Sequence, residues 1–441
     1  MVKKTTKELM NSTFVKNVLI MITGTAAAQL ITMLLSPIIT RLYGPEAFGT
    51  LGLFMGIIAV ITPIASLTYP IGIVLPKEDN DAKMLSYISI LISLIMATTL
   101  LIILLLFDNK ITQIFNIGEI GKLLYFIPLY IIFVSFKQIT EQWLIRIKKF
   151  GVNARTTFFQ ALIMQSGKIG FGFVWPTATI LIIWTVMGEL IKTILALFVA
   201  KKHDAFKLKQ QFEKPKFKDI KKIAKIYNDF PIYRAPQAFL HSLSQNLPVM
   251  FITAFYGTAS AGFFALSKSV MAKPAELIGK SFGDVFYPSI SEAANKGEKI
   301  TILILKSVIG LTLIGLIPFG TIILFGPNIF GVIFGEEWIM AGVYARWLSL
   351  MLYFVFIYQP CIKSFPILRI QSFHLKYTFL SALFQLLGLY IANIIYNDEV
   401  KAILSYSIIS CIFSVFLIIF TLKISRKFDL NVRINQTSYR N

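Results

Sequence analysis

Cysteine and histidine are scarce in this chain, which holds two cysteines and three histidines among its 441 residues. Cys361 and Cys411 lie in apolar stretches, at a spacing that suits neither a zinc site nor a disulfide framework. His203, His241 and His374 are far apart in the sequence. The sequence therefore predicts no metal site, and it gives no sign of a cofactor.

Charged residues are also few. They make up 15% of the chain, against about 25% in typical soluble domains, whereas hydrophobic residues make up 56% and the mean hydropathy is +0.71. A water-soluble fold of this size cannot bury so much apolar surface, so we expect an integral membrane protein. Lysine and arginine outnumber aspartate and glutamate by 43 to 22. Because these basic residues lie in short segments between apolar stretches, they indicate cytoplasmic loops rather than binding of nucleic acid.

Twelve stretches of the chain are long and apolar enough to span a bilayer, which requires about 20 such residues. They are 17–40, 47–72, 84–107, 123–145, 154–174, 177–199, 229–254, 258–283, 304–325, 341–362, 375–395 and 401–422. With a cytoplasmic N-terminus, 32 lysines and arginines fall on the cytoplasmic side and four on the outer side. This asymmetry favours twelve transmembrane helices with both termini in the cytoplasm.

A basic stretch divides the twelve spans into two groups of six. It runs from Lys201 to Lys225, holds ten lysines, and is predicted to be a cytoplasmic linker that contacts anionic lipid headgroups. We therefore expect an N-terminal six-helix lobe at 1–200, the linker at 201–228, a C-terminal six-helix lobe at 229–422 and a basic cytoplasmic tail at 423–441.

The first two predicted helices of each group resemble each other. Tyr43-Gly44 recurs as Tyr256-Gly257, 213 positions later, where glycine would permit a tight turn. This match predicts a parallel repeat, which is common in secondary transporters whose substrate path runs between the halves.

Polar residues recur at helical spacing in the first helix of each group. The residues that share one face are Thr25, Gln29, Thr32 and Ser36 in the first span, and Arg234, Gln237, His241 and Gln245 in the seventh. Either set could line a polar cavity or form hydrogen bonds between helices of the bundle.

Several basic residues lie inside predicted spans with no acidic residue three or four positions away. These are Lys168, Arg234 and Lys268. A lone charge near mid-bilayer costs at least about 2.5 kcal/mol on insertion scales, so each needs a partner. Because ammonium and guanidinium groups bind phosphate, we interpret these three residues, together with Lys273 and Arg41, as candidates for a cationic cavity that holds a phosphate-bearing substrate.

Other intramembrane charges have oppositely charged neighbours on the same helix. Glu189 and Lys192 are three residues apart and, with Asp229, are candidates for an ion pair or for energy coupling. Lys280 lies four residues from both Glu276 and Asp284, which predicts a further ion pair.

Short motifs follow one another along the chain in an order that resembles a known family. They are TRLYGPEAFG at 40–49, DFPIY at 229–233, GFFAL at 262–266, VFYP at 285–288 and FGEEWIMAG at 334–342. Together they resemble bacterial polysaccharide transporters, the oligosaccharide-lipid flippases (O-antigen flippase type) of the multidrug/oligosaccharidyl-lipid/polysaccharide exporter superfamily.

The resemblance implies an all-α polytopic fold, with two six-helix lobes in a V around a central cavity. It implies a flippase that moves undecaprenyl-diphosphate-linked oligosaccharide repeats, of O-antigen, capsule or similar type, from the cytoplasmic to the outer leaflet by alternating access. The expected partners are that lipid-linked oligosaccharide, membrane lipids, and the polysaccharide polymerase and chain-length machinery. The expected location is the bacterial cytoplasmic (inner) membrane. The motifs carry over no substrate-binding residues, so the site prediction rests on charge.

Two other functions stay open. A drug or cation exporter of the same superfamily should have acidic residues in its cavity, whereas the intramembrane charges without an oppositely charged neighbour on the same helix are basic here. A membrane glycan polymerase should have a sizeable outer loop with catalytic groups, but the longest outer stretches here have 15 residues and no histidine. Gly279-Lys280-Ser281 lacks the earlier glycine of a P-loop, since Pro274 stands there. We therefore expect a transporter and not an enzyme.

Overall fold

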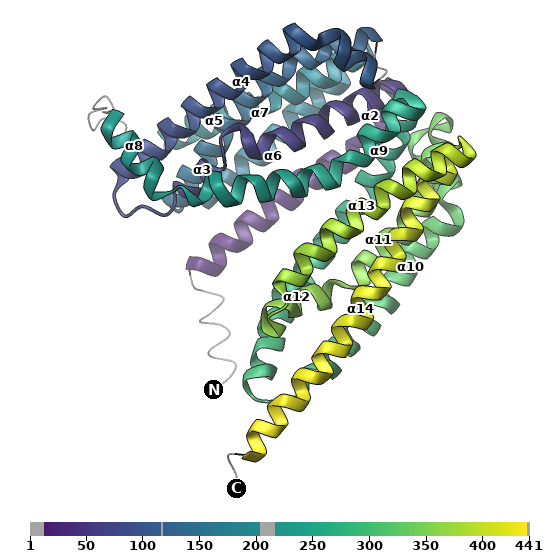
Figure 1. Cartoon of the computed structure of the whole chain (residues 1–441). Coiled ribbons are helices and arrows are strands. Elements are labelled where there is room, and N and C mark those ends of the chain that lie inside the picture. The colour runs from purple at the N-terminus through teal and green to yellow at the C-terminus, as the bar shows by residue number, and fades with distance from the viewer. Residues whose placement is uncertain (1–12, 116–117, 203–216, 439–441) are drawn as a thin grey trace. The chain divides into compact units, whose positions relative to one another are not determined.

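The computed structural model describes residues 13–115, 118–202 and 217–438, and all the elements in these ranges are helical (Figure 1). Side chains are described within 23–113, 121–199 and 218–430, except for 274–278, 280–281 and 284. The helices are α2 (Thr13–Ala65), α3 (Tyr69–Gly72), α4 (Asp79–Phe115), η1 (Gly118–Tyr125), α5 (Phe126–Arg146), α6 (Phe150–Gly172), α7 (Ala178–Lys202), α8 (Phe217–Ile226), η2 (Phe230–Arg234), α9 (Ala235–Asn295), α10 (Ile300–Phe334), η3 (Glu336–Trp338), α11 (Ile339–Ile357), α12 (Gln359–Leu368), α13 (Gln371–Tyr396) and α14 (Glu399–Ser438).

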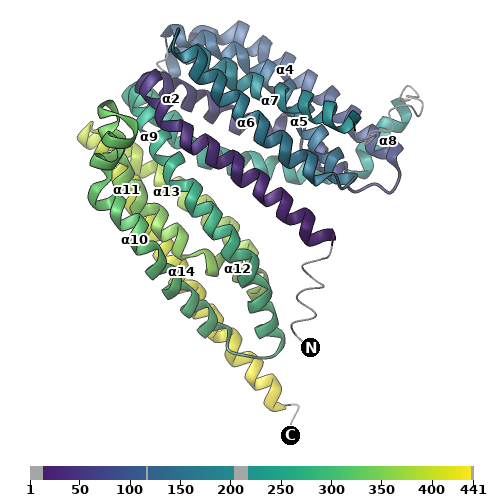
Figure 2. The same ribbon diagram turned by 180° about the vertical axis from the view of Figure 1, so that it is seen from behind.

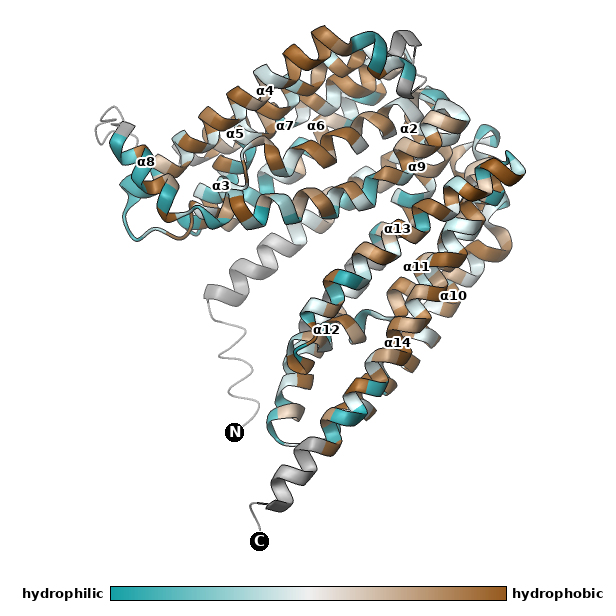
Figure 3. Ribbon diagram, in the orientation of Figure 1, coloured by the Kyte–Doolittle hydropathy of each residue, from teal (hydrophilic) through white to brown (hydrophobic). Residues whose placement is uncertain are grey.

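Nine helical segments in the described part are long and apolar enough to cross a membrane. Figure 3 shows apolar residues along most of α4, whereas polar residues gather at α8. The fifth predicted span forms a helix, α6, but it is not among the nine segments. The prediction of an all-α, multi-pass membrane protein is thus confirmed, and the count of twelve spans stays a prediction.

Two of the nine segments, Thr23–Ala65 and Phe230–Lys273, each cover most of two predicted spans. The long helices α2 and α9 are interrupted at Gly44 (φ 68°, ψ 173°) and at Gly257 (φ 87°, ψ 178°). Positive φ angles favour glycine because it has no Cβ. The two glycines that the sequence repeat relates therefore have the same backbone conformation, and the chain changes direction there.

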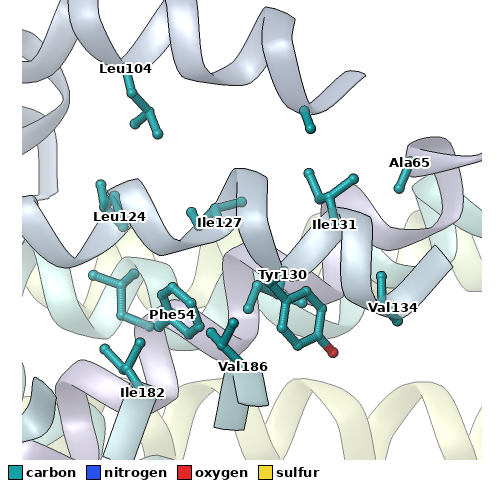
Figure 4. Packing of buried hydrophobic residues seen from close by; sticks show 13 residues of the cluster. Phe54, Ala65, Leu104, Leu124, Ile127, Tyr130, Ile131, Val134, Ile182 and Val186 are labelled. Carbon is teal, nitrogen blue, oxygen red and sulfur yellow. The ribbon is translucent and has the colours of Figure 1, made fainter. Parts of the chain in front are cut away.

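The chain forms two compact units, Met1–Ala261 and Gly262–Asn441, here called unit 1 and unit 2. In unit 1, α2 packs along α6, α6 along α7, α7 along α5 and α5 along α4 (Figures 1 and 2). The largest core cluster of this unit draws on α2, α4, η1, α5 and α7, and Figure 4 shows Phe54, Tyr130 and Val186 close together within it.

Unit 1 extends into α9 because residues of the seventh predicted span pack on α2. A Cβ atom at Gly56 would lie 2.9 Å from the Val249 side chain, and Met250 packs against the main core cluster. The predicted lobes are instead divided at the linker 201–228, and their boundaries stay a prediction.

Part of that linker is the short helix α8. Its residue Ile223 is 4% exposed and packs with residues of α3, α4 and η2, while the Tyr69 hydroxyl donates a 3.2 Å hydrogen bond to the Ala224 carbonyl. The lysines on the opposite face of α8 are exposed: Lys218, Lys221, Lys222 and Lys225. Residues 203–216 of the linker lie outside the described part.

In unit 2, α10 packs along α11, α11 along α14 and α14 along α13. The beginning of α10 is held by α14, because the Asp429 carboxylate accepts hydrogen bonds from the backbone amides of Ile300 and Thr301, at 3.0 and 3.2 Å. The predicted tail at 423–441 continues the last helix as far as Ser438. Its side chains beyond residue 430 lie outside the described part.

Candidate functional site

Arg234 is placed by an irregular turn at the beginning of the seventh predicted span. Phe230–Arg234 is a π-helix, and Pro231 stands in its first turn. Single π turns inside helices are frequent at functional sites. The Arg234 guanidinium lies 5.8 Å from the centre of the Phe230 ring, and that ring is buried in unit 1. Since Thr68 donates a 3.3 Å hydrogen bond to the Phe230 carbonyl, the turn is tied to the body of the unit.

The polar residues that follow Arg234 are exposed together. Gln237, His241 and Gln245 share its helical face, and all four side chains are exposed. Arg234 and Gln245 are 11 positions apart, or roughly 16 Å of helix at 1.5 Å per residue. Such a face can offer a cation, amide groups and an imidazole to an anionic, hydroxyl-rich ligand. We call these four residues the α9 polar face.

The first-span polar set is only partly exposed. Thr25 and Gln29 are exposed on α2, whereas Thr32 is half-buried and donates its hydroxyl to the Ala28 carbonyl at 2.9 Å. The Thr32 hydroxyl is therefore hydrogen-bonded within its own helix. Arg41 is exposed on the same helix, three residues before the break at Gly44. Asp229 is exposed immediately before the π turn.

Lys168 lies inside unit 1. Its residue is 7% exposed on α6, and its backbone carbonyl accepts a 2.5 Å hydrogen bond from the Tyr43 hydroxyl of α2. It is thus part of the α2–α6 contact and does not belong to the α9 polar face.

Two further predicted cavity residues, Lys268 and Lys273, belong to unit 2 and are half-buried on α9. The Lys268 ammonium lies 5.9 Å from the centre of the Phe264 ring, and Phe264 packs edge-on against Tyr406 of α14. The predicted ion pairs of Lys280 with Glu276 and Asp284 fall on side chains outside the described part.

Glu189 and Lys192 form ion pairs, but their partners are on another helix. Lys137 of α5 pairs with Glu189 of α7 at 2.5 Å, and Glu141 of α5 pairs with Lys192 of α7. The Tyr130 hydroxyl also interacts with the Glu189 carboxylate. All four charged side chains are less than a quarter exposed. We call them the α5–α7 charge quartet.

Three intramembrane charges that the structure draws attention to are not among the predicted site residues: Lys137, Glu141 and Arg346. Lys137 and Glu141 lie four residues apart, a spacing at which they could have been recognised as a pair. Arg346 also lies inside a predicted span without an acidic residue three or four positions away, the same signal that selected Arg234.

Comparisons with known proteins bear on the family and the fold of the chain. A family model described as "Polysaccharide biosynthesis protein" matches residues 38–342, well over half of the chain. A search of curated protein sequences gave no significant match.

Among solved structures, the chain resembles an inward-facing multidrug resistance MATE family transporter of the MOP superfamily. The TM-score is 0.62 at 12% identity, covering 93% of this chain and 99% of the other. The lipid II flippase MurJ, in an inward closed conformation, gives a TM-score of 0.62 at 18% identity, covering 93% and 90%. A MATE in complex with MaL6 gives 0.53 at 15% identity, covering 95% of each chain.

Identities this low establish a shared fold only, whereas the family model matches the sequence itself. The resemblance inferred from the short motifs is confirmed. The chain belongs to the polysaccharide biosynthesis protein family and has the fold of the MATE and MurJ transporters of the MOP superfamily.

Proposed function

We propose that the protein is a flippase that moves undecaprenyl-diphosphate-linked oligosaccharide repeats, of O-antigen, capsule or similar type, from the cytoplasmic to the outer leaflet. The family match supports a role in polysaccharide biosynthesis, and the fold is shared with a protein described as a lipid II flippase. The location that fits this function is the bacterial inner membrane with both termini in the cytoplasm. The polysaccharide polymerase and chain-length machinery are the partners that would use the product.

The proposal rests on which of the intramembrane charged side chains are in ion pairs and which are exposed. Among the side chains that the structure describes, the carboxylates beyond the first residue of a predicted span are Glu141 and Glu189, and each is paired with a lysine. The Glu276 side chain lies outside the described part. Neither Glu141 nor Glu189 is free to receive a cationic drug. The α9 polar face, by contrast, presents the cation of Arg234. This balance favours an anionic substrate over the cation-exporter alternative.

In this proposal the α9 polar face receives the headgroup of the substrate. Arg234 would bind a phosphate through its guanidinium fork, which suits phosphate oxygens better than a lysine does. Gln237, His241 and Gln245 would exchange hydrogen bonds with sugar hydroxyls. Lys268, on unit 2, stays a separate candidate for binding a phosphate group. The protein itself would make and break no covalent bond.

The test is deletion of the gene followed by lipid analysis and complementation. A strain without the flippase should accumulate single lipid-linked repeats on the cytoplasmic side. Loss of a polymerase would still allow export of single repeats, and loss of a drug exporter would raise drug sensitivity and leave the lipids unchanged. Either of these last two results would overturn the proposal.

Complementation with point variants tests the residues. Arg234→Gln and Lys268→Gln should accumulate in the membrane at normal levels and fail to restore surface glycan. Arg426→Gln is the matched control, because Arg426 is an exposed arginine of α14 beyond the predicted last span. Full activity of both substitutions would refute the assignment of these two residues, although the flippase function itself would still stand on the deletion result.

A further inference from the structure

Arg346 is an intramembrane arginine that neither the α9 polar face nor the charge quartet uses. It lies on α11, seven residues after the helix begins at Ile339, or roughly 10 Å along the helix at 1.5 Å per residue. With the predicted cytoplasmic termini, this end of α11 is the outer end, so Arg346 lies in the outer half of the membrane.

The guanidinium of Arg346 has few protein partners. Its Nη2 donates a 3.1 Å hydrogen bond to the Leu324 carbonyl of α10. Its Nε is buried and has no hydrogen-bond partner among the described protein atoms. None of the ion pairs between described side chains includes Arg346. One neutral carbonyl therefore accompanies a group that carries a full charge and five N–H donors.

The contact between α10 and α11 brings this side chain to the edge of unit 2. The helices touch at two glycines, since a Cβ atom at Gly326 would lie 2.7 Å from the Gly342 carbonyl oxygen and 3.6 Å from Cγ of Arg346. The aliphatic part of the Arg346 side chain thus lies beside the contact of Gly326 with Gly342, which we call the α10–α11 seam. The guanidinium reaches the backbone of α10 at Leu324. The apolar side chains of Leu324 and Phe325 are 65% and 55% exposed, respectively. Apolar side chains exposed on a membrane-spanning helix are suited to contact lipid acyl chains.

A charged guanidinium beside lipid is costly unless an anion lies with it. The guanidinium fork matches the geometry of phosphate oxygens, and every phospholipid and polyprenyl carrier has a phosphate at its headgroup. We propose that Arg346 forms a binding site for the phosphate group of a lipid at the α10–α11 seam. The lipid is either a phospholipid of the outer leaflet or the polyprenyl carrier, and the second case rests on the proposed flippase function.

The test measures lipid binding to the purified full-length protein in detergent by native mass spectrometry. Three probes are added in separate titrations: undecaprenyl phosphate, phosphatidylglycerol, and diacylglycerol, which has acyl chains and no phosphate. The wild-type protein should bind at least one of the phosphate lipids more tightly than diacylglycerol. Equal binding of all three would overturn the proposal without any variant.

The variant Arg346→Gln should weaken binding of the phosphate lipid by about tenfold or more, since one charge-assisted contact is lost. Binding of diacylglycerol should not change. Arg426→Gln, on the same unit, should bind like the wild type. If the glutamine variant does not fold, Arg346→Met replaces it, because methionine is apolar, of similar length and readily accommodated in a membrane span.

The outcomes separate the two lipid sources. If Arg346→Gln weakens binding of undecaprenyl phosphate alone, the site is assigned to the carrier. If it weakens binding of phosphatidylglycerol to the same extent, the site is assigned to phospholipid. Unchanged affinities in a folded variant would show that Arg346 only ties α11 to α10, and the proposal would be wrong. Because the experiment requires no transport, its failure leaves the flippase proposal untouched, and failure of the deletion test leaves the phospholipid form of this site untouched.

Discussion

The α5–α7 charge quartet gives the sharpest prediction about stability. Lys192→Met removes one member and leaves the Glu141 carboxylate, which is 24% exposed, without its closest partner. Breaking a buried ion pair costs about 3–5 kcal/mol when the remaining charge is fully isolated. Here the cost should be lower, at roughly 2–3 kcal/mol, because Glu141 is partly exposed and also interacts with Lys137.

The double variant Glu141→Met/Lys192→Met tests the reasoning further. Replacing both members of a buried pair by apolar groups of similar volume is often neutral or stabilising. The double variant should therefore be within about 1 kcal/mol of the wild type and more stable than Lys192→Met alone, so the two substitutions should be strongly non-additive.

The assay is thermal unfolding of the purified protein in detergent, followed by the fraction that stays monodisperse after heating. A loss of 2–3 kcal/mol should lower the midpoint by roughly 4–12 °C, on the scale of about 2–4 °C per kcal/mol for a folded unit of this size. The control is Lys296→Met, which breaks the exposed ion pair with Glu292 and should hardly change the midpoint. The reasoning would be refuted if Lys192→Met unfolded at the wild-type midpoint, or if the double variant were the least stable of all.

Three further substitutions test other parts of the fold in the same assay. Asp429→Ala removes the side chain that caps α10 and should cost about 1 kcal/mol; an unchanged midpoint would show that the cap is dispensable. Gly257→Ala should cost about 1 kcal/mol or more through its positive φ alone, since open space surrounds that position, whereas Gly310→Ala, also in open space but within regular helix, should be neutral or stabilising. Tyr43→Phe removes the hydroxyl that bonds to the Lys168 carbonyl and should cost about 1 kcal/mol, and equal stability would mean that this hydrogen bond contributes nothing.

Much of the helical framework can be predicted from the sequence, because apolar length alone decides where a helix can lie in lipid. The turns at Gly44 and Gly257 were also visible, since the Tyr-Gly pairs recur at one offset and glycine tolerates their positive φ. The predicted spans leave gaps at 41–46 and 255–257, whereas in the structure the helix runs up to each glycine and resumes directly after it.

The charge partners were harder to predict. Helical spacing identifies neighbours on one helix, so it suggested a pair of Glu189 with Lys192. The partners on α5 depend on which faces of α5 and α7 meet, and that is decided by packing of the whole unit. The same limit applies to Lys168, which has no acidic neighbour along its helix and lies against α2 in the folded unit.

The charge quartet also has a consequence for biogenesis. In the apolar part of α5, Lys137 is followed by Glu141 four residues later, and in α7 Glu189 is followed by Lys192 three residues later. The apolar part of each helix therefore carries one positive and one negative charge, within reach of each other, as it leaves the ribosome and enters the bilayer. This part of the helix is neutral during insertion, when no other helix is available to compensate a charge. When α5 and α7 meet, the charges can exchange partners. The pairs within each helix, which first compensate its charges in the bilayer, are then replaced by the pairs that join the two helices.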